Sequence, residues 1–251
     1  MRKVLLIGAG NMGGAMIPGL SRWDLSVVEG NPKRREELAR LYPDIQIMDT
    51  IPPLNGYTAV LAIKPQSLHT LKTTGRAEAL VSILAGVTLD TLRSRIEADA
   101  YIRAMPNIAA LKNRAVSSVT GDESYKREAL EILSCIGKAI WLDSEKQLDI
   151  ATGIGGSAPA WLALVAEALS DGAVRLGLPR DKSYRYISAL FEGTGAMLED
   201  THPALLKDMV MSPGGTTAEG YAALEKGAVR DAFVEAMSRC YEKSVELGAK
   251  E

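Results

Sequence analysis

The stretch Val4-Leu5-Leu6-Ile7-Gly8-Ala9-Gly10-Asn11-Met12-Gly13 decides how the rest of the chain is interpreted. Its four leading apolar residues, two of them β-branched, predict a strand buried on both faces of a parallel sheet. The glycines have the spacing G-x-G-x-x-G, and residues 14–20 can continue as a helix. Gly8 suits a tight turn, Gly10 a close approach to a pyrophosphate, and Gly13 close helix–strand packing. The stretch predicts a dinucleotide site at a helix N-terminus, and the alternative is a glycine-rich turn without a ligand.

Composition and charge limit the class of protein. The chain has 251 residues, 47% hydrophobic and 24% charged, which is typical of a soluble globular protein with one large or two ordinary domains. The net charge is −2 with acids and bases interspersed, so we expect neither nucleic acid nor a membrane as a partner. Two cysteines and two histidines, all far apart, predict no disulfide framework and no metal site. The apolar run before Gly8 is too short for a signal peptide, and no run reaches membrane-spanning length, so we expect a cytoplasmic protein.

Further apolar runs predict buried strands that end at one edge of a sheet. These runs cover residues 25–29, 45–47, 58–63, 80–84 and 101–105, with shorter ones at 114–120 and 138–142 around a helix near 124–135. Helical stretches at about 66–75 and 89–97 predict a doubly wound, mostly parallel sheet with right-handed crossovers. The residues that follow the strands come to the edge where open α/β sheets bind ligands. They are Gly8, Glu29, Lys64, Gly86 and Asn107.

The end of the second predicted strand bears on the choice of cofactor. Glu29 stands where an acid accepts hydrogen bonds from the adenosine ribose hydroxyls, which favours NADH. Lys33 and Arg34 follow closely and could instead hold the 2′-phosphate of NADPH. A carboxylate at Glu29 would repel that phosphate, so we lean towards NADH.

Strand-like runs stop near Asp149, and the remaining hundred or so residues are helical in pattern. We therefore predict a dinucleotide-binding Rossmann domain over residues 1–149 and an all-α domain over 150–251. The predicted helix 157–176 carries its charges on one stripe and is apolar almost all round. Such a helix must be buried on most sides, which predicts burial against a second chain. Burial against the chain's own first domain is the alternative.

The run Ser212-Pro213-Gly214-Gly215-Thr216-Thr217 is a second candidate site. Two glycines and three hydroxyls just before a helix form an anion-receptive N-terminus, and free amides there can hold a carboxylate without any arginine. The alternative is a capped helix start with a glycine turn.

Several motifs, taken in order, resemble the pyrroline-5-carboxylate reductase family over essentially the whole chain. They are residues 8–13, Ala62-Ile63-Lys64-Pro65-Gln66, Ala85-Gly86-Val87-Thr88, Arg103-Ala104-Met105-Pro106-Asn107, Gly155-Gly156-Ser157-Ala158-Pro159-Ala160-Trp161, and residues 212–217. The resemblance implies an NAD(P)H-dependent reductase that makes L-proline from 1-pyrroline-5-carboxylate. It also implies a Rossmann domain, a C-terminal helical domain that forms a homodimer, and a ring of dimers as a larger assembly.

The resemblance also implies site residues. Cofactor contacts are expected from Ile7, Gly8, Ala9, Gly10, Asn11, Met12, Asn31, Ala62, Ile63, Lys64, Pro65, Ala85, Gly86 and Asn107, together with Glu29 from its position. Substrate contacts are expected from Ser212, Gly214, Gly215, Thr216 and Thr217.

The chemistry predicts a role for each part of the second site. The cofactor supplies the difficult step, so the protein supplies orientation and charge placement. Thr217 is the candidate catalytic residue, whose hydroxyl would orient the ring nitrogen of the cyclic imine, while amides from Gly214 to Thr216 would fix the carboxylate. One rival is another imine reductase or a β-hydroxyacid dehydrogenase, but the latter needs a lysine on the inter-domain helix, and residues 157–178 contain none. A non-catalytic nucleotide sensor, a rival of another class, would not use the second site.

Overall fold

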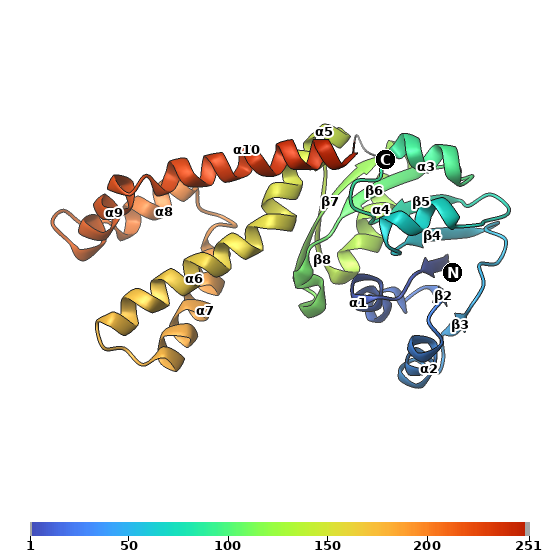
Figure 1. Ribbon diagram of the computed structural model, residues 1–251, viewed down its shortest axis with the longest axis horizontal. Coiled ribbons are helices and arrows are strands. Elements are labelled where there is room, and N and C mark those ends of the chain that lie inside the picture. Colours follow the sequence, from blue (N-terminus) through green and yellow to red (C-terminus); the bar gives the residue numbers. More distant parts are fainter. Residues whose placement is uncertain (1, 249–251) are drawn as a thin grey trace. The chain divides into compact units, whose positions relative to one another are not determined.

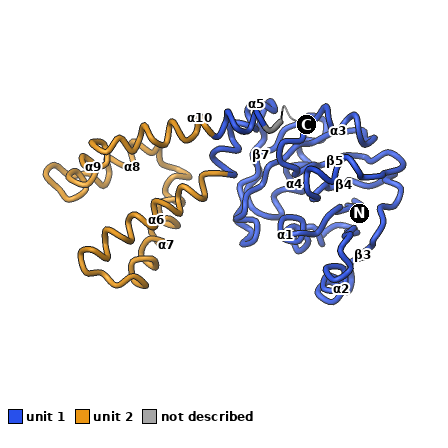
Figure 2. The backbone as a smooth tube through the Cα atoms, viewed as in Figure 1, with its two compact units in different colours: residues 1–156, 240–251 blue, residues 157–239 orange. Residues whose placement is uncertain are grey.

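The computed structural model describes residues 2–248, which form two compact units (Figure 1, Figure 2). Among the described residues, the first unit holds residues 2–156 and 240–248, and the second holds Ser157–Arg239. The change of unit comes later than the boundary predicted after residue 149, because α5 (Glu145–Thr152) packs on strands of the first unit.

The first unit is built on an eight-stranded sheet with the order β3-β2-β1-β4-β5-β6-β7-β8. The strands are β1 (Lys3–Ile7), β2 (Asp24–Val28), β3 (Gln46–Met48), β4 (Tyr57–Leu61), β5 (Ala79–Ser82), β6 (Tyr101–Met105), β7 (Ala115–Gly121) and β8 (Gly137–Trp141). All neighbours are parallel except β6 and β7. The order is that of a doubly wound dinucleotide-binding sheet, which confirms the predicted fold class.

Helices cover both faces of this sheet (Figure 1). They are α1 (Asn11–Leu20), α2 (Pro32–Leu41), α3 (Leu89–Arg95), α4 (Lys126–Leu133) and α5, with 3₁₀ turns η1 (Pro65–Thr70), η2 (Ile108–Lys112), η3 (Glu123–Tyr125) and η4 (Ser134–Ile136). Because side chains alternate along a strand, Val4 and Leu6 enter one core, with α1 and α4, while Leu5 and Ile7 enter the other, with α3. Burial of β1 on both faces confirms the pattern expected for a central parallel strand.

One connection differs from the sequence prediction, and the direction of β7 is a feature that the sequence analysis did not predict. The helix expected at 66–75 is only the 3₁₀ turn η1, because Thr73, Thr74 and Gly75 are poor helix formers and Gly75 has a φ of +76°. β7 runs antiparallel to β6 because the link from Met105 to Ala115 is too short for a crossover, so the chain returns from the same edge of the sheet.

The second unit is helical, as predicted. It contains α6 (Ala158–Arg175), α7 (Arg180–Met197), α8 (Pro203–Val210), α9 (Thr216–Lys226) and the first part of α10 (Val229–Gly248), and the π-helical turn η5 (Gly153–Ser157) precedes α6. The buried hydroxyls of Ser170 and Ser183 share a hydrogen bond, and Arg180 donates to Ser170, which joins α6 to α7.

Much of α6 is exposed within the chain. Leu162, Leu164 and Leu169 are 51%, 64% and 47% exposed, and Ser170 is the one buried residue among those of α6. By length and composition alone, the helical stretch Glu145–Arg175 could cross a membrane, contrary to the expectation that no run is long enough. This is weak evidence for a membrane span, because a helix that buries its apolar surface in protein passes the same test. Exposure of the apolar surface is what the predicted burial against a second chain requires.

Candidate functional site

A cavity of about 420 Å³ lies at the carboxyl ends of β1, β2 and β4. It contains seven of the predicted cofactor residues: Ile7, Gly8, Gly10, Glu29, Ala62, Ile63 and Lys64. Sequence reasoning missed its other lining residues, which are Val28, Gly30, Asp49, Ile51, Ser67 and Leu71. The cavity therefore sits where strand order reverses about β1, the ligand position in open α/β sheets.

The three glycines of the first motif, Gly8, Gly10 and Gly13, have different structural roles. Gly8 has a φ of +95°, and a Cβ there would come within 2.7 Å of the Ala62 carbonyl oxygen. A Cβ on Gly13 would meet the Gly8 carbonyl oxygen at 2.1 Å, so both residues must be glycine for β1, β4 and α1 to pack. A Cβ on Gly10 would have no heavy atom within 4 Å. Gly10 thus leaves an open surface, which fits a ligand that lies against the backbone.

The N-terminus of α1 faces this surface. Gly10 is its N-cap, and no side-chain hydrogen bond caps the helix. The first amides of a helix lack intrahelical acceptors, which leaves those of Asn11 and Met12 available to a phosphate. Helix dipole and amides both favour an anion here.

Glu29 joins the end of β2 to the glycine turn. Its Oε2 accepts a hydrogen bond from the Ala9 amide at 2.9 Å, and its Oε1 accepts one from the Asn31 amide at 2.8 Å. Each carboxylate oxygen has a further lone pair, so Glu29 can still accept hydrogen bonds from a ribose. Both amides orient the carboxylate at the cavity.

The two arginines that follow are committed to other partners. Arg34 donates from Nε to the Ala9 carbonyl at 3.1 Å and from a terminal nitrogen to Glu37 at 2.7 Å. Arg35 donates to the carbonyl oxygens of Glu29 and Gly30 at 2.8 and 2.9 Å. Arg34 and Arg35 therefore stabilise the backbone around Glu29 through hydrogen bonds to its carbonyl groups.

The remaining cofactor candidates lie beside this cavity or along the same edge. Ala9 and Asn31 contact Glu29, Met12 is in the first turn of α1, and Pro65 begins η1. Ala85 and Gly86 follow β5, Gly86 with a φ of +79°, and Asn107 follows β6. The Asn107 side-chain oxygen accepts a hydrogen bond from the Val116 amide at 3.3 Å, which ties the end of β6 to the start of β7.

The second candidate site lies in the second unit, at the start of α9. Gly215 is the N-cap of α9 and donates to the Ser212 carbonyl at 3.0 Å, while Gly214 has a φ of +68°. The N-cap of α9 is a glycine, which has no side chain to cap the helix, so neither Thr216 nor Thr217 is the capping residue. Both threonines are exposed at the first two helical positions, where amides have no intrahelical acceptor. The amides at the start of α9 suit a carboxylate, and the Gly215 N-cap after the Gly214 turn also fits the simpler interpretation of a helix start with a glycine turn.

An ion cluster at the carboxyl side of β6 was not predicted. Arg103 is 5% exposed and pairs with Glu145 at 2.9 Å and Asp149 at 2.8 Å, both on α5. The signal in the sequence was an arginine inside an apolar strand, which requires buried partners. An acidic pair four residues apart at the start of a helix further along the chain, here α5, could have supplied them.

Other titratable groups lie away from the two candidate sites. Burial raises the pKa of the Cys135 thiol to about 11 and also raises the pKa of Tyr125, whose hydroxyl shares a hydrogen bond with buried Thr58. Within residues 2–248, no cluster of three or more His, Cys, Asp or Glu side chains could hold a metal ion.

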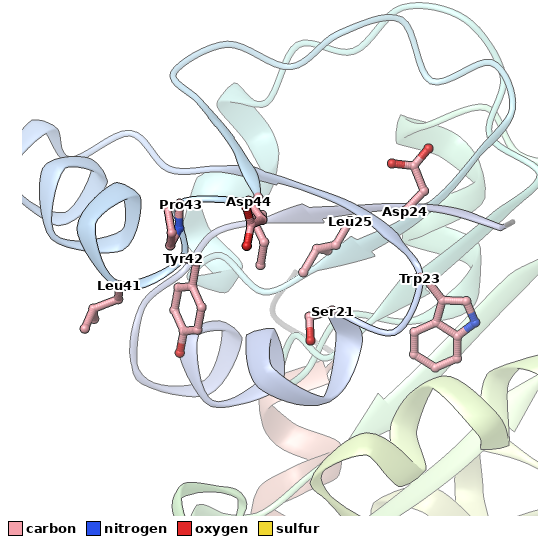
Figure 3. Close-up of a pocket in the computed structure, with 9 residues that line it drawn as sticks. Ser21, Trp23, Asp24, Leu25, Leu41, Tyr42, Pro43 and Asp44 are labelled. Carbon is pink, nitrogen blue, oxygen red and sulfur yellow. The ribbon is translucent and has the colours of Figure 1, made fainter.

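A larger cavity, of about 670 Å³, lies at the opposite edge of the sheet (Figure 3). Its walls come from the ends of α1 and α2 and the starts of β2 and β3, and Trp23 and Tyr42 lie on opposite sides of it. None of the predicted site residues lines it. The larger cavity therefore holds no predicted site residue, whereas the smaller one contains the glycine turn and remains the candidate site.

Comparisons with known proteins agree with this geometry. Residues 145–247 match a family model described as pyrroline-5-carboxylate reductase dimerisation, and residues 3–86 match one described as NADP oxidoreductase, coenzyme F420-dependent. Pyrroline-5-carboxylate reductases of Methanosarcina acetivorans and Escherichia coli are 35% and 34% identical, with 99% and 98% of both chains covered.

Solved structures of pyrroline-5-carboxylate reductases also resemble this chain. The chain superposes on a pyrroline-5-carboxylate reductase of Coxiella burnetii with a TM-score of 0.87, 26% identity and 97% of each chain covered. A Plasmodium falciparum pyrroline carboxylate reductase with NADP bound gives a TM-score of 0.79, 25% identity and 98% coverage of each chain.

Proposed function

Since the chain belongs to the pyrroline-5-carboxylate reductase family, we propose that its carboxyl-edge cavity binds the cofactor and that its Ser212–Thr217 loop binds the substrate. The chain is an NAD(P)H-dependent oxidoreductase that reduces the C=N bond of 1-pyrroline-5-carboxylate to give L-proline. What we add is the role of each residue.

The first unit fits a dinucleotide. The open surface at Gly10 would take a pyrophosphate, and the amides of Asn11 and Met12 would hold its charge. Ala62, Ile63, Lys64 and Pro65 would line the next part of the edge, and Ala85, Gly86 and Asn107 the part beyond it. When bound, the nicotinamide supplies the hydride for the reduction.

Glu29 supports a preference for NADH. Two backbone amides hold its carboxylate at the cavity, where it can accept hydrogen bonds from ribose hydroxyls and would repel a 2′-phosphate. Of the two cations that could hold a 2′-phosphate, Arg34 donates to the Ala9 carbonyl and to Glu37, while Lys33 is exposed on the first turn of α2. The fixed carboxylate of Glu29, held by two backbone amides, is the observation that carries the preference.

The loop before α9 supports substrate binding by backbone. The free amides at Thr216 and Thr217 would hold the substrate carboxylate, and the turn at Ser212 and Gly214 shapes the approach to them. The Thr217 hydroxyl, not used as a cap, would orient the imine nitrogen. A threonine hydroxyl is a weak acid, so its role is orientation, with the proton drawn from solvent.

A second copy of the chain would cover the apolar surface of the helical unit. The match of residues 145–247 to a dimerisation model supports homo-oligomerisation, and the exposed leucines of α6 supply surface for it. A ring of dimers and a cytoplasmic location stay predictions.

Steady-state oxidation of NADH and of NADPH with 1-pyrroline-5-carboxylate tests the proposal. We expect turnover with both cofactors and a higher kcat/KM for NADH. A higher kcat/KM for NADPH would contradict the role of Glu29, while absence of turnover with either would contradict the assignment of the sites. A β-hydroxy acid with NAD⁺ serves as the control substrate and should give no reaction.

A further inference from the structure

The buried cluster of Arg103, Glu145 and Asp149 has a fixed geometry. Arg103 lies inside β6, and its two terminal nitrogens reach different carboxylates, Glu145 Oε1 at 2.9 Å and Asp149 Oδ1 at 2.8 Å. The guanidinium is planar and rigid, so it sets the direction of both carboxylates, which stand one turn apart on α5. The first turn of α5 is thereby fixed against β6.

The cluster also reaches the turn that follows β5. Glu145 Oε1 accepts a second hydrogen bond, from the amide of Leu89 at 3.0 Å. Leu89 is the first residue of α3 and comes three residues after Gly86, one of the expected cofactor contacts. One carboxylate thus joins β6, α5 and the turn Ala85–Thr88.

α5 runs directly into the π-helical turn η5 at the carboxyl end of β6. A Cβ on Gly156 would lie 3.7 Å from the Met105 methyl, and one on Gly155 would lie 3.5 Å from a methyl of Val116. Val116 donates to Asn107, so η5 lies beside the end of β6 where Asn107 stands. π-helical turns are rare and occur frequently at functional sites.

We propose that Arg103 is a positioning residue for the reduction, which acts by holding η5 and the turn Ala85–Thr88 in place at the carboxyl ends of β5 and β6. The inference rests on the proposed function, because these segments matter only where the reacting end of the cofactor binds there. Arg103 would contribute to rate and not to cofactor affinity. The dinucleotide is held mainly at β1 and β2, and β4 and β5 separate β6 from β1 in the sheet.

The alternative is a cluster that only stabilises the fold. Removing one partner of a buried ion pair destabilises a protein in either case, so a lower Tm does not separate the two. The discriminating readouts are the local opening of η5 and the isotope effect on the reduction.

The first variant is Arg103→Lys, which keeps the positive charge but loses the two-pronged guanidinium that donates to both carboxylates. The other two, Asp149→Asn and Glu145→Gln, each remove one negative charge and change the side chain less. The matched control is Tyr125→Phe, which removes the buried hydrogen bond to Thr58 near the amino ends of the strands. All four lose a buried polar interaction in the first unit, and only the first three touch the cluster.

Hydrogen exchange of the protein without cofactor tests the placement directly. In Asp149→Asn and Arg103→Lys we expect amides of residues 150–156 to exchange about tenfold faster or more, with residues 4–14 unchanged. Tyr125→Phe should leave residues 150–156 as they are in the wild type. Unchanged exchange in all three cluster variants would overturn the inference even if the enzyme is active.

Kinetics test the consequence. For Asp149→Asn and Glu145→Gln we expect kcat to fall about tenfold or more while the Kd for NADH changes less than about twofold. The primary isotope effect with NADH deuterated at C4 should rise, because the reduction itself becomes slower. A fraction of inactive protein would lower kcat without changing that isotope effect, as would be expected for Tyr125→Phe. A wild-type isotope effect in every cluster variant would overturn the positioning role, whereas a wild type without turnover would overturn the proposed function instead.

Discussion

The carboxylate of Glu29 and the backbone amide of Ala9 are joined by a hydrogen bond of 2.9 Å, which links the end of β2 to the glycine turn after β1. Under the proposed function, a negative charge is thereby fixed where NADPH would place its 2′-phosphate. The same bond makes Glu29 part of the glycine turn as well as a proposed ligand contact.

Replacing Glu29 with Ser should shift preference towards NADPH. The change removes the fixed charge and leaves the amides of Ala9 and Asn31 without their acceptor, so both become free to bind a phosphate. We expect the ratio of kcat/KM for NADPH to that for NADH to rise about tenfold or more, which corresponds to ~1.4 kcal/mol. Glu36→Ser, on the exposed part of α2, changes the net charge equally and should leave the ratio unchanged. A constant or falling ratio in Glu29→Ser would reject this role.

Thr217→Ala should impair turnover and leave stability nearly unchanged. No side chain caps α9, so the roughly 1 kcal/mol expected for loss of an N-cap does not apply here. Loss of an orienting hydroxyl should lower kcat/KM for the imine about ten- to a hundredfold, ~1.4–2.7 kcal/mol.

Thr217→Ser keeps the hydroxyl and is the packing control, which should retain most activity. The measurement is kcat/KM together with a Kd for the cofactor from fluorescence titration, which should barely change. Full activity in Thr217→Ala would remove this side chain from the mechanism and leave the amides as the substrate site.

An acidic residue on α6 should weaken the oligomer. Leu164 is 64% exposed in the single chain, and burying it against a second copy would stabilise the dimer, whereas Leu164→Asp would bury a charge. We expect dimers or their multiples for the wild type at low micromolar concentration in analytical ultracentrifugation, and a shift to smaller species for Leu164→Asp. Leu41→Asp, at a residue 59% exposed on α2, is the control and should sediment as the wild type does. A well-folded wild-type monomer would contradict the dimer.

Cys135 should be almost unreactive at neutral pH. Burial raises the pKa of its thiol to about 11, so at pH 8 only about one molecule in a thousand carries the thiolate. Alkylation followed by mass spectrometry should show a rate that rises about tenfold per pH unit up to pH 11 or to the onset of unfolding.

The raised pKa of Cys135 also makes the free energy of unfolding fall as the pH rises above 9. The folded pKa lies above the ordinary value of 9.0, so the thiol contributes its full stability below pH 9 and loses it as the pH rises towards 11. Cys135→Ala should remove this part of the alkaline dependence. Rapid labelling of Cys135 at pH 7 would show that the thiol is not buried.

The sequence predicted the sheet well because its signals were local. Apolar runs such as Val4–Ile7 and the turn chemistry after them determine both the strands and the residues at their ends. The direction of β7 was harder, because it depends on the length of one link that contains no strand signal of its own. The helix expected at 66–75 failed for a similar reason, since the apolar Leu68 and Leu71 fit a 3₁₀ turn and an extended segment equally well.

Some parts of the candidate site could likewise be predicted from the sequence, and others could not. The residues of the glycine turn follow from spacing, and the Ser212–Thr217 loop follows from composition before a helix. The bonds of Glu29 to Ala9 and of Arg103 to Glu145 and Asp149 join residues far apart in the chain, so no periodicity reveals them. Only the burial of an arginine within a strand predicts that partners exist, and it does not say which residues they are.

If a homologue of this chain no longer bound a cofactor, the three glycines of the first motif would differ in how readily they could be substituted. A Cβ on Gly8 or Gly13 would come within 2.7 or 2.1 Å of a backbone oxygen, so neither residue could be replaced without disturbing the fold. A Cβ on Gly10 would meet no heavy atom within 4 Å, so the fold itself would tolerate a larger residue there. Gly8 and Gly13 are therefore explained by packing alone. Gly10 is the one glycine of the three whose retention would indicate selection for a bound nucleotide.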